Sequence, residues 1–322
     1  MVRRMTDETN TEDVTPQGER IAKALARAGI ASRREVERMI EDGRIKIDGK
    51  RLETPATLIT GLDGITVDGK PVAQADETRL WRFHKRKGTL TTYSDPEGRP
   101  TVFENLPNHV GRVIAVGRLD MNTEGLLLFT NDGELARWLE LPSNGFVRRY
   151  RARCYGSIKQ ADLDKLRDGI TIDGIHYGEI DARLESEQAT NVWLNIAIKE
   201  GKNREVRRIM EHLGLEVNRL IRIAYGPFTL GTMKREMTAP VSRHQMIELL
   251  PEFLQKRQGS VAAPKQKVAD PSKWAKAKPK PSKPGESRRR KSSGKPDPTR
   301  RPARRGISGG QGDYAPKKKR PT

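Results

Sequence analysis

The positive charge of this chain is concentrated at its C-terminal end, and this separates what can fold from what cannot. Residues 251–322 contain 22 Lys and Arg against 5 Asp and Glu, which gives +17 of the net charge of +20. They also contain 11 of the 20 prolines and few aliphatic residues. Such a segment cannot bury enough apolar surface to offset its chain entropy. We therefore predict a disordered basic tail over 251–322, a polycation suited to binding nucleic acid.

The rest of the chain is nearly neutral and divides into three parts. Residues 1–17 are polar and are predicted to be disordered. A composition typical of globular domains follows, and its patterns change near residue 78. We expect a small domain over 18–78 and a larger domain over 79–250.

Several classes of protein are disfavoured by composition. No apolar run approaches the roughly 20 residues of a membrane span, and we expect no signal peptide because no apolar segment follows the first basic residues. The single cysteine, Cys154, cannot form an intrachain disulfide, which favours a reducing compartment such as the cytoplasm. The five histidines lack the spacing of metal ligands, so no metal site is predicted.

The pattern of residues 18–78 predicts two short helices followed by β-hairpins. Apolar residues at helical spacing begin at Ile21, and Ser32 with Glu35 forms a capping-box pattern that opens the second helix. Asp-Gly pairs at 48–49 and 68–69 are typical of tight hairpin turns. Basic residues on the outer faces of such helices are often only solvated charges.

The sequence of residues 20–50 favours a more specific interpretation; it reads RIAKALARAGIASRREVERMIEDGRIKIDGK. It resembles the S-four-type RNA-binding domain, named after a small-subunit ribosomal protein. The resemblance implies a module that docks its two helices on structured RNA. Arg33, Arg34 and Arg38 would be its phosphate contacts.

Residues 79–250 show strands and helices in an irregular order. Strands are predicted over 79–84, 126–130, 146–155 and 192–198, and helices over 134–140, 159–167 and 206–213. No βαβ rhythm is repeated. We expect an α+β fold with a mainly antiparallel mixed sheet flanked by helices.

The segment from Gly117 to Gly125 is the best candidate for a chemical site. It lies between an apolar run and the predicted strand 126–130, and two glycines bracket a loop that carries Arg118 and Asp120. A simple turn in which Asp120 bonds its own backbone would also explain this pattern.

Three motifs in the same order resemble the pseudouridine synthases, in the branch that modifies ribosomal RNA. GRLDMNTEGLLLFTNDGELA resembles their central motif, HKRKGTLTTYSDPEGRPTVF the first and EGKNREVRRIMEHLGLEVNRLIRIAYGPF the last. The strand around Tyr150 resembles the tyrosine strand of the family. One position departs from the pattern: Arg86 follows Lys85 where the family usually has proline, so a different local loop geometry is expected.

The resemblance implies a reaction and the residues that carry it out. A uridine loses its carbon–nitrogen glycosidic bond, rotates and rejoins through carbon 5 of uracil, without redox change, cofactor or metal. Asp120 would be the nucleophile, attacking either uracil carbon 6 or the ribose anomeric carbon. Tyr150 would lie against the uracil and help to remove the proton from carbon 5; a half-buried core tyrosine is the simpler alternative.

A nearby cation would keep the required carboxylate ionised. The resemblance points to Arg207, and at about 100° per residue it borders the apolar stripe of its predicted helix. Arg204 and Arg208 are expected to point further outward, and Arg118 to point away from Asp120. The alternative for Arg207 is a surface pair with Glu211. RNA contacts are predicted for Arg118, Lys85 and Arg204, with His84 as a further candidate.

The resemblance favours ribosomal RNA as partner, in particular 23S rRNA near the peptidyl transferase centre, with ribosome assembly intermediates as a further possibility. We expect a monomer that binds no membrane. The same reaction on 16S rRNA or another 23S site remains an alternative. So does a non-catalytic RNA-binding assembly factor. A third alternative is a glycosidase that uses Asp120 and Glu124 as paired carboxylates and releases free uracil.

Overall fold

A computed structural model describes residues 18–260. The predictions of disorder for residues 1–17 and for most of the basic tail lie outside the described residues. The predicted start of the disordered tail at residue 251 is too early, because α7 (Pro251–Ser260) follows α6 (Arg243–Leu249) directly. Phe253 of α7 is buried against the core, so the folded part continues past residue 250.

The N-terminal domain has the predicted helices and hairpins. Helix α1 (Ile21–Arg27) packs on α2 (Arg33–Glu41), and both bonds of the predicted capping box at Ser32 are present. A four-stranded sheet pairs β2 (Ile45–Ile47) with β3 (Lys50–Arg51) and β5 (Ile65–Val67) with β6 (Lys70–Pro71). A second small sheet pairs β1 (Glu19–Arg20) with β4 (Leu58–Ile59). The Asp-Gly turns have positive φ at both residues, as a tight hairpin turn requires.

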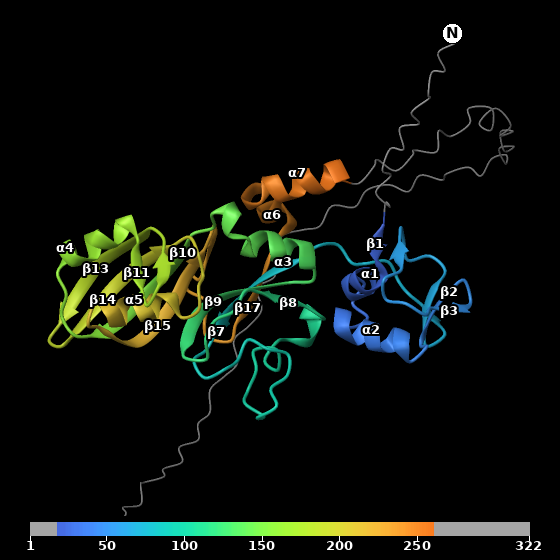
Figure 1. Cartoon of the computed structure of the whole chain (residues 1–322), viewed down its shortest axis with the longest axis horizontal. Helices are drawn as coiled ribbons and strands as arrows, with labels where there is room; N and C mark the ends of the chain where they lie inside the picture. The colour runs from blue at the N-terminus through green and yellow to red at the C-terminus, as the bar shows by residue number, and fades with distance from the viewer. Residues whose placement is uncertain (1–17, 261–322) are drawn as a thin grey trace, which may run out of the picture. The chain divides into compact units, whose positions relative to one another are not determined.

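The larger domain is built on one nine-stranded sheet (Figure 1). Its strands run β13-β14-β10-β15-β9-β7-β17 in space, with β16 added to β15 and β8 to β9. The strands are β7 (Leu80–Lys85), β8 (Ile114–Val116), β9 (Thr123–Thr130), β10 (Arg148–Tyr155), β13 (Ile180–Gln188), β14 (Asn191–Ile198), β15 (Glu216–Tyr225), β16 (Phe228–Thr229) and β17 (Thr238–Val241). All pairs are antiparallel except β9 with β15, which confirms the predicted mixed, mainly antiparallel sheet.

Helices and short segments complete the domain. Asp132 caps α3 (Gly133–Glu140) by accepting from the backbone N–H of Glu134. Helix α5 (Glu205–His212) precedes β15, and α4 (Gln160–Asp164) packs on β13. The remaining elements are the hairpin β11 (Ile170–Ile172) with β12 (Ile175–Tyr177) and three 3₁₀ segments: η1 (Asn108–Val110), η2 (Pro142–Asn144) and η3 (Lys165–Asp168). Over residues 18–260 no helix has the length and apolarity that a membrane crossing needs.

Strand β9 is the centre of this domain because both of its faces are covered. Leu127 and Phe129 pack into one core with α4 and α5, and Leu126 and Leu128 pack into another with α3, α6 and α7. All eight residues of β9 are buried. The strand starts at Thr123, three residues before the predicted start, so the candidate loop is shorter than the two glycines suggest.

The parallel pairing of β9 with β15 depends on Gly125. Gly125 lies opposite Arg222 and has φ +110°, and a Cβ built there would lie 2.3 Å from the carbonyl oxygen of Arg222. Only glycine permits both this conformation and this close approach. The approach brings the Asp120 loop next to β15 and the helix α5 that precedes it.

Candidate active site

An open cavity of about 1340 Å³ lies where β9 begins. Its walls come from the loop after β7, the loop between β8 and β9, strand β10, and the start of α5 with β15. Five of the predicted site residues line it: Arg118, Asp120, Tyr150, Arg204 and Arg207. The fold therefore brings together residues that are up to 89 positions apart in the sequence.

The backbone around Asp120 is held by a buried lysine. Lys85, on β7, is fully buried, and its Nζ donates to the carbonyl oxygens of Asp120 at 3.1 Å and Thr123 at 2.9 Å. The prediction that Lys85 contacts RNA is therefore wrong. Pairing of β7 with β9 places the ammonium group inside the domain. There it donates to the carbonyl oxygens of the loop and cannot reach a phosphate.

Burial also changes the acidity of this lysine. The pKa of Lys85 is lowered to about 8, mainly because burial disfavours the charged form, while the negative charges of Asp120 and Glu124 act in the opposite direction. At neutral pH the ammonium form still predominates. The backbone of Asp120 is therefore bonded to a buried ammonium group.

Arg86, at the position where the family usually has proline, also helps to hold the backbone around Asp120. Its carbonyl oxygen accepts from Lys85 Nζ at 3.1 Å and from the hydroxyl of Thr89 at 3.1 Å. Its guanidinium pairs with Glu236 at 3.1 Å on the surface. The residue thus contributes its backbone to the support of the loop and its side chain to a separate contact.

Arg204 is the cation that pairs with Asp120. Its Nη1 lies 3.7 Å from Asp120 Oδ2, and about half of its side chain is exposed. Arg204 is more exposed than Arg207, as expected, but that expectation gave it no contact with Asp120. That expectation treats the residue as part of a helix, whereas it is the N-cap of α5 in a left-handed conformation, φ 50°. A helical projection does not apply to a residue outside the helix.

Arg207 reaches the same loop through its backbone. Its Nη2 donates to the carbonyl oxygen of Asn122 at 2.9 Å and its Nη1 to that of Val217 at 2.9 Å. Arg207 therefore joins α5 and β15 to the segment that carries Asp120. The pKa of Arg207 is lowered, first by burial and then by the charge of Arg204, while the charge of Asp120 raises it. In the described part of the chain, its bonds go to these carbonyls and no ion pair joins it to Glu211.

Tyr150 and Arg118 complete the predicted set. Tyr150 is 8% exposed on β10 and lines the cavity, so it is a core residue and a wall of the site at once. Arg118 is exposed and lines the same cavity as Asp120. No ion pair joins Arg118 to Asp120 in the described residues, although both line the cavity, as does the buried Leu119 between them.

Glu205 is a cavity residue that the sequence patterns did not indicate. Its side chain is buried at the start of α5, and Oε2 accepts from the backbone N–H of Lys202 at 2.8 Å. Burial, with a smaller contribution from the charge of Glu200, raises the pKa of Glu205 to about 7. Its only sequence signal is its place in the last motif, directly after Arg204.

Glu124 does not share the cavity with Asp120. Its carboxylate pairs with Arg219 at 2.5 Å and Arg235 at 3.4 Å. Along β9 the neighbouring Thr123 lines the cavity, so Glu124 points to the opposite face. A glycosidase would need two carboxylates flanking one bond. The structure therefore separates Asp120 from Glu124, the pair on which the hydrolytic alternative was based.

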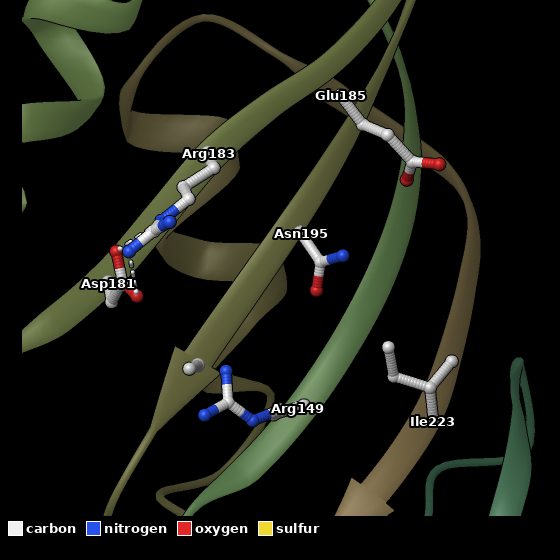
Figure 2. Close-up of a pocket in the computed structure, with 7 residues that line it drawn as sticks. Arg149, Asp181, Arg183, Glu185, Asn195 and Ile223 are labelled. Carbon is white, nitrogen blue, oxygen red and sulfur yellow. Dashed lines mark hydrogen bonds and ion pairs between the residues drawn. The ribbon is translucent and has the colours of Figure 1, made fainter.

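A second hollow, of about 450 Å³, lies over β10, β13, β14 and β15 (Figure 2). Arg149, which lines it, precedes Tyr150 on β10, so the two side chains lie on opposite faces of the sheet. Arg149, Asn195 and Ile223 project into it, and Arg183 pairs with Asp181 at its edge. None of the predicted catalytic residues lines it. The predicted RNA contacts Arg33, Arg34 and Arg38 are exposed on α2 in the N-terminal domain.

The fold and the cavity agree with comparisons to known proteins. Residues 79–212 match the family described as RNA pseudouridylate synthase, and residues 19–65 match the S4 domain. An uncharacterised RNA pseudouridine synthase from Rickettsia felis is 45% identical over 219 residues, which cover 67% of this chain and 93% of the relative. The chain belongs to the RNA pseudouridine synthases, and the resemblance found in its motifs is confirmed.

Two further comparisons refine this placement. The ribosomal large subunit pseudouridine synthase B of Escherichia coli O157:H7 is 40% identical over 248 residues, covering 73% of this chain and 85% of the relative. A solved pseudouridylate synthase superposes with a TM-score of 0.51 at 22% identity, covering 72% of this chain and 99% of that one. That superposition shows the shared fold, which includes the mixed sheet described above.

Proposed function

We propose that this enzyme converts a specific uridine of ribosomal RNA to pseudouridine, with 23S rRNA near the peptidyl transferase centre as the substrate. The observation that carries the proposal is the cavity itself. A carboxylate, Asp120, lies in it with Tyr150 on the wall and Arg204 at 3.7 Å. Lys85 and Arg207 hold the backbone of the same loop.

The residues fit the bonds that must change. Asp120 acts as nucleophile on uracil carbon 6 or on the ribose anomeric carbon, and the bond between N1 and the ribose breaks. The uracil, now free of the ribose, turns in the cavity, carbon 5 bonds to the anomeric carbon, and the bond to Asp120 breaks and returns its electron pair to the carboxylate. Carbon 5 then loses its proton with the help of Tyr150, and N1 carries a proton in the product. Arg204 pairs with the carboxylate of Asp120, and Arg207 holds the backbone of its loop in place.

The choice of substrate rests on the relatives and on surface charge. The ribosomal large subunit enzyme of E. coli O157:H7 matches over 85% of its own length. An S4 domain with Arg33, Arg34 and Arg38 exposed on α2 fits a module that binds structured RNA. We infer a monomer that works on ribosome assembly intermediates in the reducing cytoplasm, in keeping with the free, buried Cys154. In this proposal the two folded domains and the basic tail all contact RNA.

The proposal is tested by mapping pseudouridines in 16S and 23S rRNA from a strain that lacks the gene. Carbodiimide treatment followed by reverse transcription reports each modified site. We expect one 23S site to lose its signal and to regain it when the gene is restored. Loss of a 16S site instead would move the substrate to the small subunit. No loss in either RNA would support the non-catalytic assembly factor.

A further inference from the structure

A ladder of aromatic rings leads from the core of the larger domain to the rim of the cavity. Phe129, inside the core, contacts Phe103 edge-on with ring centroids 5.4 Å apart. Tyr93 stacks on Phe103 at 3.8 Å with an angle of 14° between the rings. Half of Tyr93 is exposed, whereas Phe103 is partly buried and Phe129 fully buried. A large ring held flat at a cavity rim with part of its surface open is a ready platform for stacking.

The platform is fixed relative to Asp120. Tyr93 and Phe103 line the same cavity as Asp120. The hydroxyl of Thr91, two residues before Tyr93, donates to the carbonyl oxygen of Leu119 at 3.0 Å and accepts from its N–H at 3.3 Å. The two loops are therefore bonded to each other one residue before the proposed nucleophile. A ligand on Tyr93 would have a set position relative to a base held over Asp120.

The platform loop is also rigid by itself. Arg99 makes two bonds to the carboxylate of Asp95, Nη2 to Oδ1 at 2.8 Å and Nε to Oδ2 at 3.1 Å. Its backbone N–H bonds the same carboxylate at 2.9 Å. Leu90 pairs with Thr101 as an isolated bridge across the base of the loop. These contacts preorganise Tyr93, so little conformational entropy is lost when a ligand stacks on it.

Positive charge accompanies the ring. The guanidinium carbon of Arg112 lies 5.7 Å from the centroid of Tyr93, and Arg118 is exposed on the same cavity. An aromatic ring flanked by arginines suits a nucleotide, because the ring takes the base and the cations take the phosphates. When a uridine leaves a folded RNA to enter the cavity, the neighbouring bases lose a stacking partner. Such a base then needs another ring on which to stack.

We propose that Tyr93 stacks an unpaired nucleobase of the RNA that flanks the target uridine, and that Arg112 contacts its phosphate. This inference rests on the proposed function, since it adds a second base position beside the reacting one. Its consequence is selectivity: the enzyme favours uridines whose neighbouring base is free to leave its helix.

The first test compares Tyr93→Ala, Tyr93→Phe and Tyr155→Ala on an unmodified 23S rRNA transcript. Tyr155 is an equally exposed tyrosine, 53%, that does not line the cavity. We expect Tyr93→Ala to raise the RNA concentration for half-maximal single-turnover rate by roughly 5- to 150-fold, the range for removal of one stacked base. Tyr93→Phe retains the ring and should behave as wild type. The proposal is overturned if Tyr93→Ala behaves as Tyr155→Ala does.

A second test keeps this proposal separate from the proposed reaction. Tyr93→Trp in an Asp120→Asn background places a fluorescent ring on the platform of an inactive enzyme. We expect the 23S transcript to quench the added fluorescence and inorganic polyphosphate of matched charge to leave it unchanged. Equal quenching by both, or by neither, would contradict stacking. Failure of the wild-type enzyme to isomerise the transcript would overturn the proposed function and leave the stacking role of Tyr93 intact.

Discussion

Three cationic side chains hold Asp120 or its loop, each through a different group. Arg204 approaches its carboxylate, Arg207 bonds the carbonyl of Asn122, and Lys85 bonds the carbonyl of Asp120 itself from inside the domain. The sequence predicted that Asp120, Tyr150 and Arg207 share one site, because the motifs that carry them are distinctive. It did not predict the burial of Lys85, which depends on strand pairing. Nor did it predict the pair with Arg204, which depends on a left-handed backbone.

The two arginines of α5 provide a matched comparison at the residue scale. Arg207 holds the Asp120 loop, whereas Arg208, the next residue, lies outside the cavity. We expect Arg207→Ala to lower the single-turnover rate by roughly 10²-fold, as for removal of a preorganised electrostatic group. Arg208→Ala should stay near wild type, and Arg204→Ala should lower the rate because the direct pair is removed. Equal decreases for Arg207→Ala and Arg208→Ala would contradict this assignment.

Glu205 should make stability depend on pH. Its pKa is raised to about 7 in the folded protein by burial, from 4.5, so the folded state binds more protons than the unfolded state between these values. The free energy of unfolding therefore falls as pH rises through this window, and the full penalty of the buried charge is present above pH 7. Glu205→Gln removes that charge and keeps an acceptor for the N–H of Lys202.

We expect Glu205→Gln to be more stable than wild type at pH 8, on the order of 1–3 kcal/mol, with the difference shrinking toward pH 5. Urea unfolding at the two pH values measures it. Glu211→Gln is the control for removal of one negative charge from the exposed side of the same helix. A stabilisation that is the same at both pH values would show that burial of the charge is not its cause.

At the scale of elements, periodicity predicted the strands and helices that bury one clear face. Strand β14 alternates buried and half-buried residues as its sequence does, and α5 buries Val206, Ile209 and Met210. The predictions were wrong where a segment has a polar or basic composition and still packs against the core. The start of β9 resembles a loop because Thr123, Glu124 and Gly125 look polar, yet both faces of the strand are covered. Helix α7 was assigned to the tail because the basic residues after it dominate the composition.

The corrected boundary at α7 has a consequence for stability. Phe253 is 6% exposed and contacts Trp138 of α3 with ring centroids 5.5 Å apart. We expect Phe253→Ala to lower the free energy of unfolding by about 3 kcal/mol, since a buried aromatic ring leaves a cavity. Gln255→Ala, on the exposed side of the same helix, should have little effect. If urea unfolding gave the two variants equal stability, α7 would not belong to the core.

At the scale of the whole molecule, the cavity and most of the positive charge belong to different parts of the sequence. The described residues 18–260 contain the cavity that must select one uridine. Residues 261–322 contain 20 Lys and Arg against 4 Asp and Glu, a net charge of +16. Composition could predict this division, but not that α7 packs on the folded part. We propose that the tail attracts RNA without selecting a site.

Deletion of 261–322 tests this division and leaves α7 whole. Binding to 23S rRNA should weaken, and its salt dependence should become shallower by roughly 0.7–0.9 in log–log slope for each phosphate that the tail no longer neutralises. The single-turnover rate at saturating RNA should remain near that of the full chain, with the same uridine modified. A salt titration and a modification map measure both. An unchanged slope, or a different target uridine, would contradict the proposed role.

The central claim, that Asp120 is the nucleophile of the isomerisation, is tested most directly by Asp120→Asn. The change keeps the size of the side chain and removes its charge and nucleophilicity. The measurement is release of tritium from 23S rRNA labelled at uracil carbon 5, because that proton must leave when carbon 5 joins the ribose. We predict that Asp120→Asn binds this RNA as wild type does and releases no tritium. Release at a rate near that of wild type would contradict the account.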